Sequence, residues 1–535
     1  MSRRLVKSAG IISAATASSR VLGMVRDAVQ AAYFATGTAA DAFNVATRIP
    51  QLLRDLFAEG AMSAAFVPTF TKTLATEGRD AAWKLGSQVI NALVLVTGVL
   101  VVLGIVFAGP LVTLYAEDYQ NIAGKLPLTI ELARVNMPFL LLIAVASACM
   151  GMLNAHKRFV APAVAPALYN VVFILCTIVF VPIFVATGVE PVMALSAGML
   201  LGGVAQIVMQ WPDLKREGYR HSWSIDFRNP HLREMLILMG PATLGVAAAQ
   251  INLLVNTSLA TGAEEGAVTA LNFAFRLMYM PVGIIGVAVA TAAIPDLARH
   301  AAAQNLGDMR GTLSWGMRLM LMLSVPATVG LMVLASPIIQ LVFERGQFGA
   351  HSTTLVAGAL FYYAPGIVSY SLVKILSPSF YSLRDSRTPM LISLVTIAVN
   401  LVLNLWLIDQ MGFKGLALGT SIAATVNAGL LLVFLSRRID GIDGTRIGTA
   451  LLKITVASVV MGAAAWAAER GLNALLPETL LGTVEVERAV RVLGAVGAGM
   501  AVLALASWAL RIEEFRQVIA RILTRVNRRR ASLPQ

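Results

Sequence analysis

Long apolar segments, separated by short breaks rich in glycine, proline and charge, run through almost the whole 535-residue chain. Hydrophobic residues make up 57% of it and charged residues only 13%, whereas soluble domains carry about 25% charged residues. A run of roughly 20 apolar residues can cross a bilayer as a helix, which satisfies its own backbone hydrogen bonds in lipid. The sequence therefore predicts an all-α polytopic membrane protein with about fourteen transmembrane helices. The predicted spans are residues 8–35, 38–71, 84–113, 129–155, 160–187, 191–213, 232–261, 267–298, 311–343, 353–382, 388–409, 413–436, 447–468 and 489–510.

Basic residues alternate along the chain in a way that orients these spans. The N-terminus, the even-numbered loops and the C-terminal tail hold 27 of the 42 lysines and arginines, and the odd-numbered loops hold six. Cytoplasmic loops are enriched in Lys and Arg, so both termini are predicted to be cytoplasmic. The net charge of +13 is then a topology signal and no evidence of nucleic-acid binding. The tail has apolar residues at helical spacing and a basic remainder, which fits a helix on an anionic leaflet or a solvated terminal helix.

Motifs for covalent chemistry do not occur in the sequence. Cys149 and Cys176 lie in apolar segments, the five histidines are scattered, and there is no zinc-binding motif or phosphate-binding glycine loop. We therefore expect no catalytic residue, no metal site and no cofactor. The basic start "MSRRLVK" is not followed by a cleavage-site pattern, so the first segment is expected to remain as an anchor.

The chain contains one internal repeat. The stretch "FNVATR" (43–48) aligns with "LNFAFR" (271–276) at an offset of 228, and two further matches, one pairing Arg158 with Arg387, give offsets of 227 and 229. Six predicted spans lie in each copy, so both copies have the same orientation, and transporters built from parallel repeats bind substrate between the halves. We predict an N-terminal six-helix lobe (1–215), a cytoplasmic linker (216–231), a C-terminal six-helix lobe (232–440) with a central cavity between the lobes, two extra transmembrane helices (447–510) and a basic amphipathic cytoplasmic tail (511–535).

Arginines inside apolar segments are the most unusual feature of the first two spans. The stretch "SRVLGMVRD" contains Arg20 and Arg26, and "RIPQLLRD" contains Arg48 and Arg54. A charge within the bilayer costs a few kcal/mol by insertion scales and usually faces a partner or a wet cavity. A glycine, Gly23, lies inside the first pair and a proline, Pro50, inside the second, which predicts breaks that open these helices.

The second copy adds Arg276, shortly before Pro281, and Lys374 in the middle of its segment. One interpretation is that the cations only pair with acids and hold helices together. Taken together, however, the cations outnumber the nearby acids, which favours a positively charged cavity that binds an anion. The planar donors of arginine suit phosphate, so a lipid-linked, phosphate-bearing substrate is expected. The nearby acids are Asp27, Asp41, Asp55 and Glu59.

Two of these acids are considered separately. Asp41 follows the charge-free stretch "ATGTAA", which suits a helix N-cap somewhat better than a gate residue. A gate or coupling role is considered for Asp41, Glu59, Arg48 and Lys374. Asparagines inside apolar segments are interpreted as bridges between helices: Asn170, Asn256, Asn272, Asn400 and Asn404.

Three stretches, "SRVLGMVRD…DAF…RIPQLLRDLFAEGAMSAAFVPTF", "FRLMYMPVGIIGVAVATAAIPDL" and "KILSPSFYSLRDSRTP", resemble the MurJ (MviN) family of lipid II flippases. This family lies within the multidrug/oligosaccharidyl-lipid/polysaccharide exporter superfamily. The resemblance extends to about residue 510 and implies a V-shaped pair of six-helix lobes, with two extra helices forming a groove for the lipid tail. It implies that Arg20, Arg26, Arg54 and Arg276 bind the pyrophosphate and that Asp41 lies at the outer gate. Many members carry an acid directly before the last of these arginines, where this chain has Phe275.

The resemblance implies a transporter of the bacterial cytoplasmic (inner) membrane and not an enzyme. Lipid II, an undecaprenyl-pyrophosphate-linked disaccharide pentapeptide, would move from the inner to the outer leaflet by alternating access. Membrane lipids and cell-wall synthesis proteins are the other expected partners, and a coupling ion or the membrane potential is left unidentified. Alternatives are an exporter of another lipid-linked saccharide or a drug or ion-coupled exporter, which should show buried acids. A membrane enzyme would need a large outer loop with carboxylates or histidines, and the longest predicted outer loop has no histidine.

Overall fold

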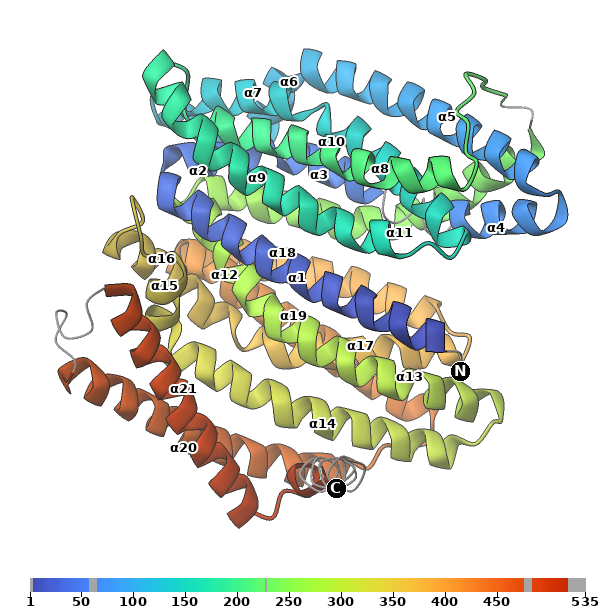
Figure 1. The fold of residues 1–535 in the computed structure, drawn as a ribbon. Coiled ribbons are helices and arrows are strands. Elements are labelled where there is room, and N and C mark those ends of the chain that lie inside the picture. The colour runs from blue at the N-terminus through green and yellow to red at the C-terminus, as the bar shows by residue number, and fades with distance from the viewer. Residues whose placement is uncertain (1–2, 57–64, 227–228, 476–483, 518–535) are drawn as a thin grey trace, which may run out of the picture. The chain divides into compact units, whose positions relative to one another are not determined.

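The computed structural model describes residues 3–56, 65–226, 229–475 and 484–517. All regular elements in these ranges are helices (Figure 1), as expected of a chain that must satisfy its backbone hydrogen bonds in lipid. They are α1 (Arg3–Phe34), α2 (Thr38–Ala46), α3 (Arg48–Arg54), α4 (Val67–Thr76), α5 (Arg79–Val106), α6 (Ala108–Tyr115), η2 (Glu117–Asn121), α7 (Lys125–Asn136), α8 (Phe139–Ala155), α9 (Val160–Thr187), α10 (Met193–Arg216), α11 (Pro230–Thr261), α12 (Ala267–Pro281), η3 (Val282–Gly286), α13 (Val287–Ala302), α14 (Leu306–Val333), α15 (Ala335–Phe343), α16 (Ala350–Tyr363), α17 (Gly366–Ser382), α18 (Arg387–Met411), α19 (Phe413–Arg438), α20 (Gly444–Leu475) and α21 (Val484–Ala509).

Among the described residues, ten helical stretches are long and apolar enough to cross a membrane, or eleven if the pair α16–α17, bent by 46°, is one span. The polytopic all-α architecture is confirmed, but fewer segments meet these criteria than the fourteen predicted. The three predicted spans that do not are residues 8–35, 38–71 and 232–261. Helices α1 and α11 occupy the first and third, and the second is divided among shorter helices.

The chain forms two compact units, residues 1–269 with 345–349 and residues 270–344 with 350–535. In the first unit, α9 packs against α1 and α10, α8 packs against α5 and α10, and α2 packs against α7. A core cluster that includes Phe70, Trp83 and Met152 joins α4, α5 and α8. Helix α11, which the sequence analysis assigned to the second lobe, packs against α4, α5 and α6 of this unit.

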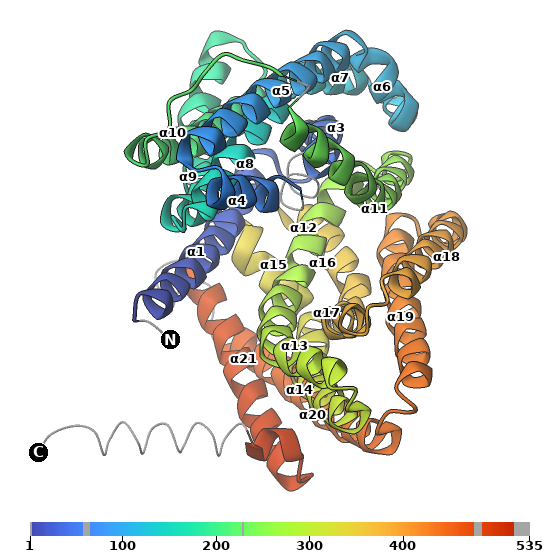
Figure 2. The ribbon, with the colours of Figure 1, turned by 90° about the vertical axis from the view of Figure 1, so that its right-hand side faces the viewer.

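In the second unit, α14 packs against α13, α17 and α20, and α19 packs against α16, α17 and α18. Figure 2 shows α21 lying beside α20, and these two helices are in extensive contact. The core includes Met317, Phe380 and Ile454. The start of the tail contributes Ile512 and Phe515 to this core, so this part of the tail packs on the protein. The rest of the tail, from residue 518, lies outside the described residues.

Corresponding helices of the two repeat copies end in the same way. Lys157 follows α8 with a φ of 60°, and Arg384 follows α17 with the same φ of 60°. In both places two backbone amides donate back to carbonyls of the last helical turn, which is a Schellman motif. The two residues differ by 227 in number, one less than the offset of 228 and two less than the offset that pairs Arg158 with Arg387.

The predicted breaks at Gly23 and Pro50 have different outcomes. Helix α1 continues through Gly23, so the break predicted there is wrong. The second span is interrupted at Thr47, which puts Pro50 in the first turn of α3, where the missing N–H removes no intrahelical bond. In the second copy, α12 ends at Pro281 and continues as the π-helical turn η3, a type of distortion frequent at functional sites.

Candidate functional site

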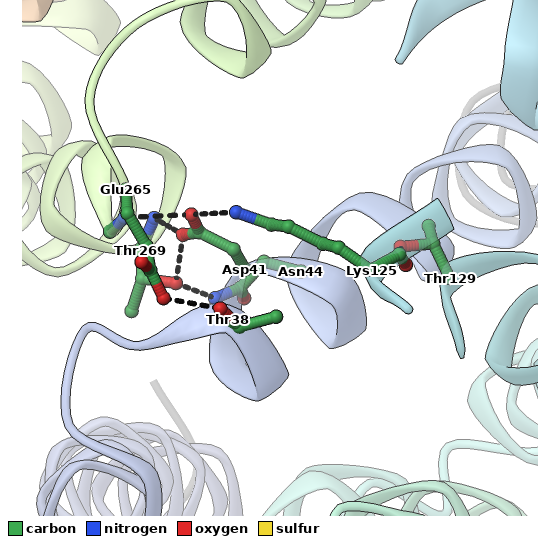
Figure 3. Close-up of polar contacts among 8 residues, drawn as sticks. Thr38, Asp41, Asn44, Lys125, Thr129, Glu265 and Thr269 are labelled. Atoms are coloured by element: carbon green, nitrogen blue, oxygen red, sulfur yellow. Dashed lines mark hydrogen bonds and ion pairs between the residues drawn. The ribbon is translucent and has the colours of Figure 1, made fainter. Parts of the chain in front are cut away.

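Asp41, on α2, is a carboxylate that is only 1% exposed and accepts four hydrogen bonds (Figure 3). Its Oδ2 accepts from Lys125 Nζ at 3.0 Å and from the amide of Gly266 at 2.8 Å. Its Oδ1 accepts from the amide and the hydroxyl of Thr269, at 2.9 and 2.7 Å. A carboxylate offers about four lone-pair sites, so this side chain is fully satisfied without water.

Two of the donors to Asp41 are backbone amides at the start of α12. Gly266 directly precedes the first residue of that helix, and Thr269 is its third residue. The first N–H groups of a helix have no intrahelical acceptor, and the helix dipole favours an anion there. Asp41 therefore caps α12 from another helix. The prediction that it caps its own helix is wrong, because α2 follows Gly37 and has no side-chain cap.

The turn before α12 has room for glycine alone at position 266. Gly266 has a φ of +86°, and a Cβ built on it would lie 2.1 Å from the carbonyl oxygen of Thr36. Two further side-chain contacts join the same segments, from Thr38 to Glu265 and from Asn44 Nδ2 to Thr269 Oγ1, the latter at 3.0 Å. We call this group, with Asp41 and Lys125, the Asp41 clasp.

Lys125 is the partner that sequence reasoning missed. It begins α7, is 1% exposed, and holds its ammonium 4.1 Å from the centre of the Tyr119 ring. It is one of the six basic residues of the odd-numbered loops and was given no role from sequence. Its pairing with Asp41 joins positions 84 residues apart, and no local spacing points to such a contact. A buried ion pair of this kind is tolerated because each charge has partners.

Arg26, on α1, lies in a polar and aromatic setting on α9. Its Nε and one terminal nitrogen donate to Asp27 Oδ1 at 3.2 and 2.9 Å, and the other terminal nitrogen donates to Asn170 Oδ1 at 3.1 Å. The guanidinium lies 5.4 Å from the centre of the Phe173 ring. Asn170 also donates to the carbonyl of Ser19 at 3.2 Å, so its predicted role as a bridge between helices is confirmed.

Arg54, at the end of α3, repeats this arrangement with the acid that follows it. Its Nε and one terminal nitrogen donate to Asp55 Oδ1 at 2.9 and 2.7 Å. The other oxygen of Asp55 accepts from Gln250 of α11 at 2.8 Å. The side chains of Arg54 and Asp55 are 30% and 22% exposed, so a ligand can still reach this pair. Arg48 begins α3 and is half-buried.

The second unit carries Arg276 and Lys374. Arg276 is exposed on α12. The half-buried Lys374, on α17, places its ammonium 5.8 Å from the centre of the Tyr279 ring. That ring stacks on Phe275 at 5.7 Å, so the side chain directly before Arg276 packs against aromatic neighbours. A Cβ on Gly286 would lie 3.1 Å from Lys374 Cγ, which shows how closely η3 approaches α17.

The remaining predicted residues have separate outcomes. Arg20 is exposed on α1, and Glu59 lies outside the described residues. The pairs Arg26–Asp27 and Arg54–Asp55 agree with the interpretation that some of these arginines pair with acids. Asp41 pairs with a lysine instead. Roles of any of these residues in substrate binding, gating or coupling stay predictions.

An apolar groove lies in the second unit where α14 and α15 meet α20 and α21. Its cavity has a volume of about 310 Å³, within the range of roughly 300–1,000 Å³ typical of ligand pockets. It is lined almost entirely by apolar residues, among them Leu331, Ile338, Met461 and Val496. A hydrocarbon chain suits such a lining. Among the described residues, no group of three or more His, Cys, Asp or Glu side chains could hold a metal ion.

Comparisons with known proteins agree with this architecture. The family model described as "Lipid II flippase MurJ" matches residues 30–484. A protein of Rhizobium meliloti (strain 1021), named "Probable lipid II flippase MurJ", is 34% identical over 471 residues, which cover 87% of this chain and 86% of the relative.

Solved structures show the same fold. One titled "Lipid II flippase MurJ, inward closed conformation" has a TM-score of 0.74 at 24% identity and covers 93% of this chain and 99% of that one. An inward-facing multidrug resistance MATE family transporter of the MOP superfamily has a TM-score of 0.64 at 16% identity, covering 79% of this chain and 94% of the other. With a family model matched over most of its length and a relative one-third identical, this chain belongs to the lipid II flippase MurJ family.

Proposed function

We propose that this protein is a transporter that moves lipid II from the inner to the outer leaflet of the bacterial cytoplasmic membrane. Membership of the lipid II flippase MurJ family supports the substrate and the absence of covalent chemistry. The helices that are apolar enough to span a membrane support a multi-pass protein. The positive-inside pattern supports cytoplasmic positions for both termini.

The pyrophosphate of lipid II is proposed to bind to Arg20, Arg26, Arg54 and Arg276. Arg26 supports this role because Asp27 and Asn170 hold its planar guanidinium in one orientation. Arginine that is pre-organised in this way loses less side-chain entropy when it binds phosphate bidentately. The acids next to Arg26 and Arg54 would satisfy these cations while no substrate is bound.

The Asp41 clasp is proposed to act as the outer gate. Its residues lie in and around segments 35–41, 113–129 and 261–267, which the charge pattern assigns to the outer side. Every bond of the clasp is a polar contact between separate helices or their leading turns, so opening exchanges these bonds for water. Water can replace these polar contacts when they break, whereas it cannot replace the contacts of an apolar core. Glu59, Arg48 and Lys374 are further proposed gate or coupling residues, in a cycle driven by a coupling ion or by the membrane potential.

The apolar groove beside α20 and α21 is proposed to hold the polyprenyl tail. Its lining lacks charged side chains, so the tail would keep an environment like that of the membrane while the head group moves. Cell-wall synthesis proteins that supply or consume lipid II are proposed as partners. The single observation that carries the assignment is the family match over residues 30–484.

The test measures lipid II on the outer leaflet of cells depleted of their own flippase. Wild-type protein is expected to restore outward lipid II, and Arg26→Ala and Arg276→Ala are expected to fail at equal membrane levels. Arg437→Ala, an exposed arginine at the end of α19, is the matched control and should retain transport. If all three variants work like wild type, the arginines are structural. If wild type itself fails while expressed, an exporter of another lipid-linked saccharide becomes the better assignment.

A further inference from the structure

A second cavity in the second unit, of about 80 Å³, is lined by four cationic side chains and two carboxylates. It lies where α14, the beginning of α20 and the residues just after α21 meet. The cations are Arg318, Arg446, Lys453 and Arg511, and the acids are Glu513 and Glu514. We call it the basic pocket. It shares no residue with the arginine sites or with the Asp41 clasp.

The charges of the basic pocket are not balanced internally. Arg318 is only 7% exposed and forms ion pairs with Glu514 and, at 3.2 Å, with Glu513. Both carboxylates are thus engaged by one arginine. Its Nε has no hydrogen-bond partner among the described residues although it is buried. The other three cations are exposed side chains at the rim, and like charges held together favour an anion between them.

Arg446 and Lys453 lie seven residues apart on α20, with Thr449 between them also lining the pocket. Residues at this spacing lie on one face of a helix, two turns apart. Lys453 is inside a predicted membrane span, where an ammonium usually faces a polar partner. The two cations therefore lie along one side of the pocket, while the Thr449 hydroxyl between them donates to the carbonyl of Thr445 at 2.8 Å.

Arg511 occupies a backbone position that glycine normally fills. Its φ is 52°, its amide donates to the carbonyl of Trp508 at 3.2 Å, and the amide of Ile512 donates to Ser507 at 3.0 Å. These bonds form a Schellman motif that ends α21, with the left-handed residue at the position where glycine costs least. A long cationic side chain there adds strain to the turn, and it lines the basic pocket.

The basic pocket and the apolar groove follow the same three helices. In α14, Arg318 of the pocket is four residues from Met322 of the groove, about 6 Å along the axis. In α20, Lys453 and Met461 are eight residues apart, about 12 Å. Leu503 of the groove lies in α21, and Arg511 of the pocket lies in the turn that ends it. A charged site next to an apolar groove suits a ligand with an anionic head and a hydrocarbon chain.

We propose that the basic pocket binds the phosphate group of an anionic phospholipid of the inner leaflet. The phosphate oxygens would contact Arg446, Lys453 and Arg511. The buried Arg318 would form the inner end of the pocket. The charge pattern assigns this end of α20 and α21 to the cytoplasmic side, where anionic lipids attract basic residues. This site does not depend on which substrate the protein transports.

The test measures lipid affinity of the purified full-length protein in detergent by native mass spectrometry. The probes are phosphatidylglycerol, phosphatidylcholine and inorganic phosphate. Wild type is expected to bind phosphatidylglycerol more tightly than phosphatidylcholine, and Arg446→Gln/Lys453→Gln is expected to lose about tenfold in affinity for phosphatidylglycerol. The double variant Arg437→Gln/Arg438→Gln removes the same charge from the nearby end of α19 and should bind like wild type.

The variant Arg511→Gly tests whether a loss of lipid binding occurs without a loss of stability. Glycine relieves the left-handed backbone, so its melting temperature should equal or exceed that of wild type while affinity for phosphatidylglycerol falls. Equal binding of the two phospholipids by wild type, or unchanged affinity in the pocket variants, would overturn the proposal. Displacement of phosphatidylglycerol by millimolar inorganic phosphate would instead identify a free-phosphate site. Displacement by lipid II at equal concentration would make the diphosphate of the substrate the occupant, which also overturns the proposal.

Discussion

The ion pair between Asp41 and Lys125 joins two side chains that are each 1% exposed. Removal of one partner leaves a buried charge uncompensated, which typically costs about 3–5 kcal/mol. We expect Asp41→Asn and Lys125→Met each to lower the free energy of unfolding by about 3 kcal/mol. The double variant should lose less than the sum by at least about 1 kcal/mol, because the charges are coupled. Denaturant unfolding in detergent measures this, and additive losses would show that the two side chains do not interact.

Glu217, at the end of α10, provides a pH-dependent contact outside the spans. Arg158 Nε donates to its Oε1 at 2.6 Å, and this hydrogen bond lowers the pKa of the Glu217 carboxyl below its ordinary value. A lowered folded-state pKa adds stability above the unfolded value of about 4.3, and this contribution is lost as the pH falls through the folded pKa. Glu217→Gln should therefore lower the melting temperature at pH 7; this difference should shrink as the pH falls below about 4.3 and vanish below the lowered folded-state pKa of Glu217.

A scan of melting temperature against pH checks this expectation. Glu190→Gln, at an exposed turn of the same unit, is the control and should follow the wild-type profile. The effect is expected to be small because the side chain of Arg158 is 60% exposed, and solvent weakens exposed ion pairs. A difference in melting temperature between Glu217→Gln and wild type that stays constant across the whole pH range would show that the effect comes from side-chain packing and not from the charge of Glu217.

Single residues also mark how far sequence reasoning can reach. The pairs of Arg26 with Asp27 and of Arg54 with Asp55 are sequence neighbours, so they could be anticipated. Lys125 could not, because its contact depends on how α7 packs against α2. Thr269 had a usable signal: it lies 228 residues after Asp41, the same as the repeat offset. Equivalent positions of the two copies therefore meet in the clasp.

At the scale of elements, the start of α12 depends on Gly266. Gly266→Ala adds a Cβ that clashes with Thr36. It also places an alanine at a φ of +86°, which L-residues rarely adopt. Gly78→Ala is the matched control, because Gly78 has a φ of +91° but nothing within 4 Å of its Cβ. We expect a loss of about 1 kcal/mol for Gly78→Ala, from backbone strain alone, and a clearly larger loss for Gly266→Ala. Equal losses in thermal unfolding would mean that the clash is relieved without disturbing the clasp.

The helices themselves were largely predictable, since apolar segments between charged loops must be helical in lipid. Their internal breaks were less so. Gly23 leaves α1 continuous, whereas the second span breaks at Thr47, before its proline. A glycine permits a kink without requiring one, and packing of α1 on α9 keeps that helix regular. A proline cannot donate a backbone hydrogen bond, so the place where a helix begins near a proline can be predicted more closely.

At the scale of the whole molecule, the internal repeat was visible in sequence because duplication preserves local motifs. Lys157 and Arg384, which occupy similar turns, differ by 227 in number, close to the repeat offset. The division into compact units was not visible, because it depends on where α11 packs, and an apolar helix can pack on either side of a boundary. The predicted lobes 1–215 and 232–440 describe the duplication, whereas the compact units describe contacts.

The apolar groove offers a test of transport that leaves the cationic residues unchanged. Gly330 lines the groove, and a Cβ there would meet only Met461, at 3.9 Å, so Gly330→Leu should direct its side chain into the cavity. Leucine also favours a helix more than glycine does, so folding should be preserved. Outward lipid II in flippase-depleted cells should fall severalfold if the groove holds the tail.

Gly497→Leu on α21 is the matched control, since a Cβ at Gly497 has nothing within 4 Å and the residue does not line the groove. It should transport like wild type at equal membrane levels. If both variants transport normally, the tail remains in the surrounding lipid while only the head group passes through the protein. If both fail, bulk on any lipid-facing helix impairs the conformational change, and the groove has no special role.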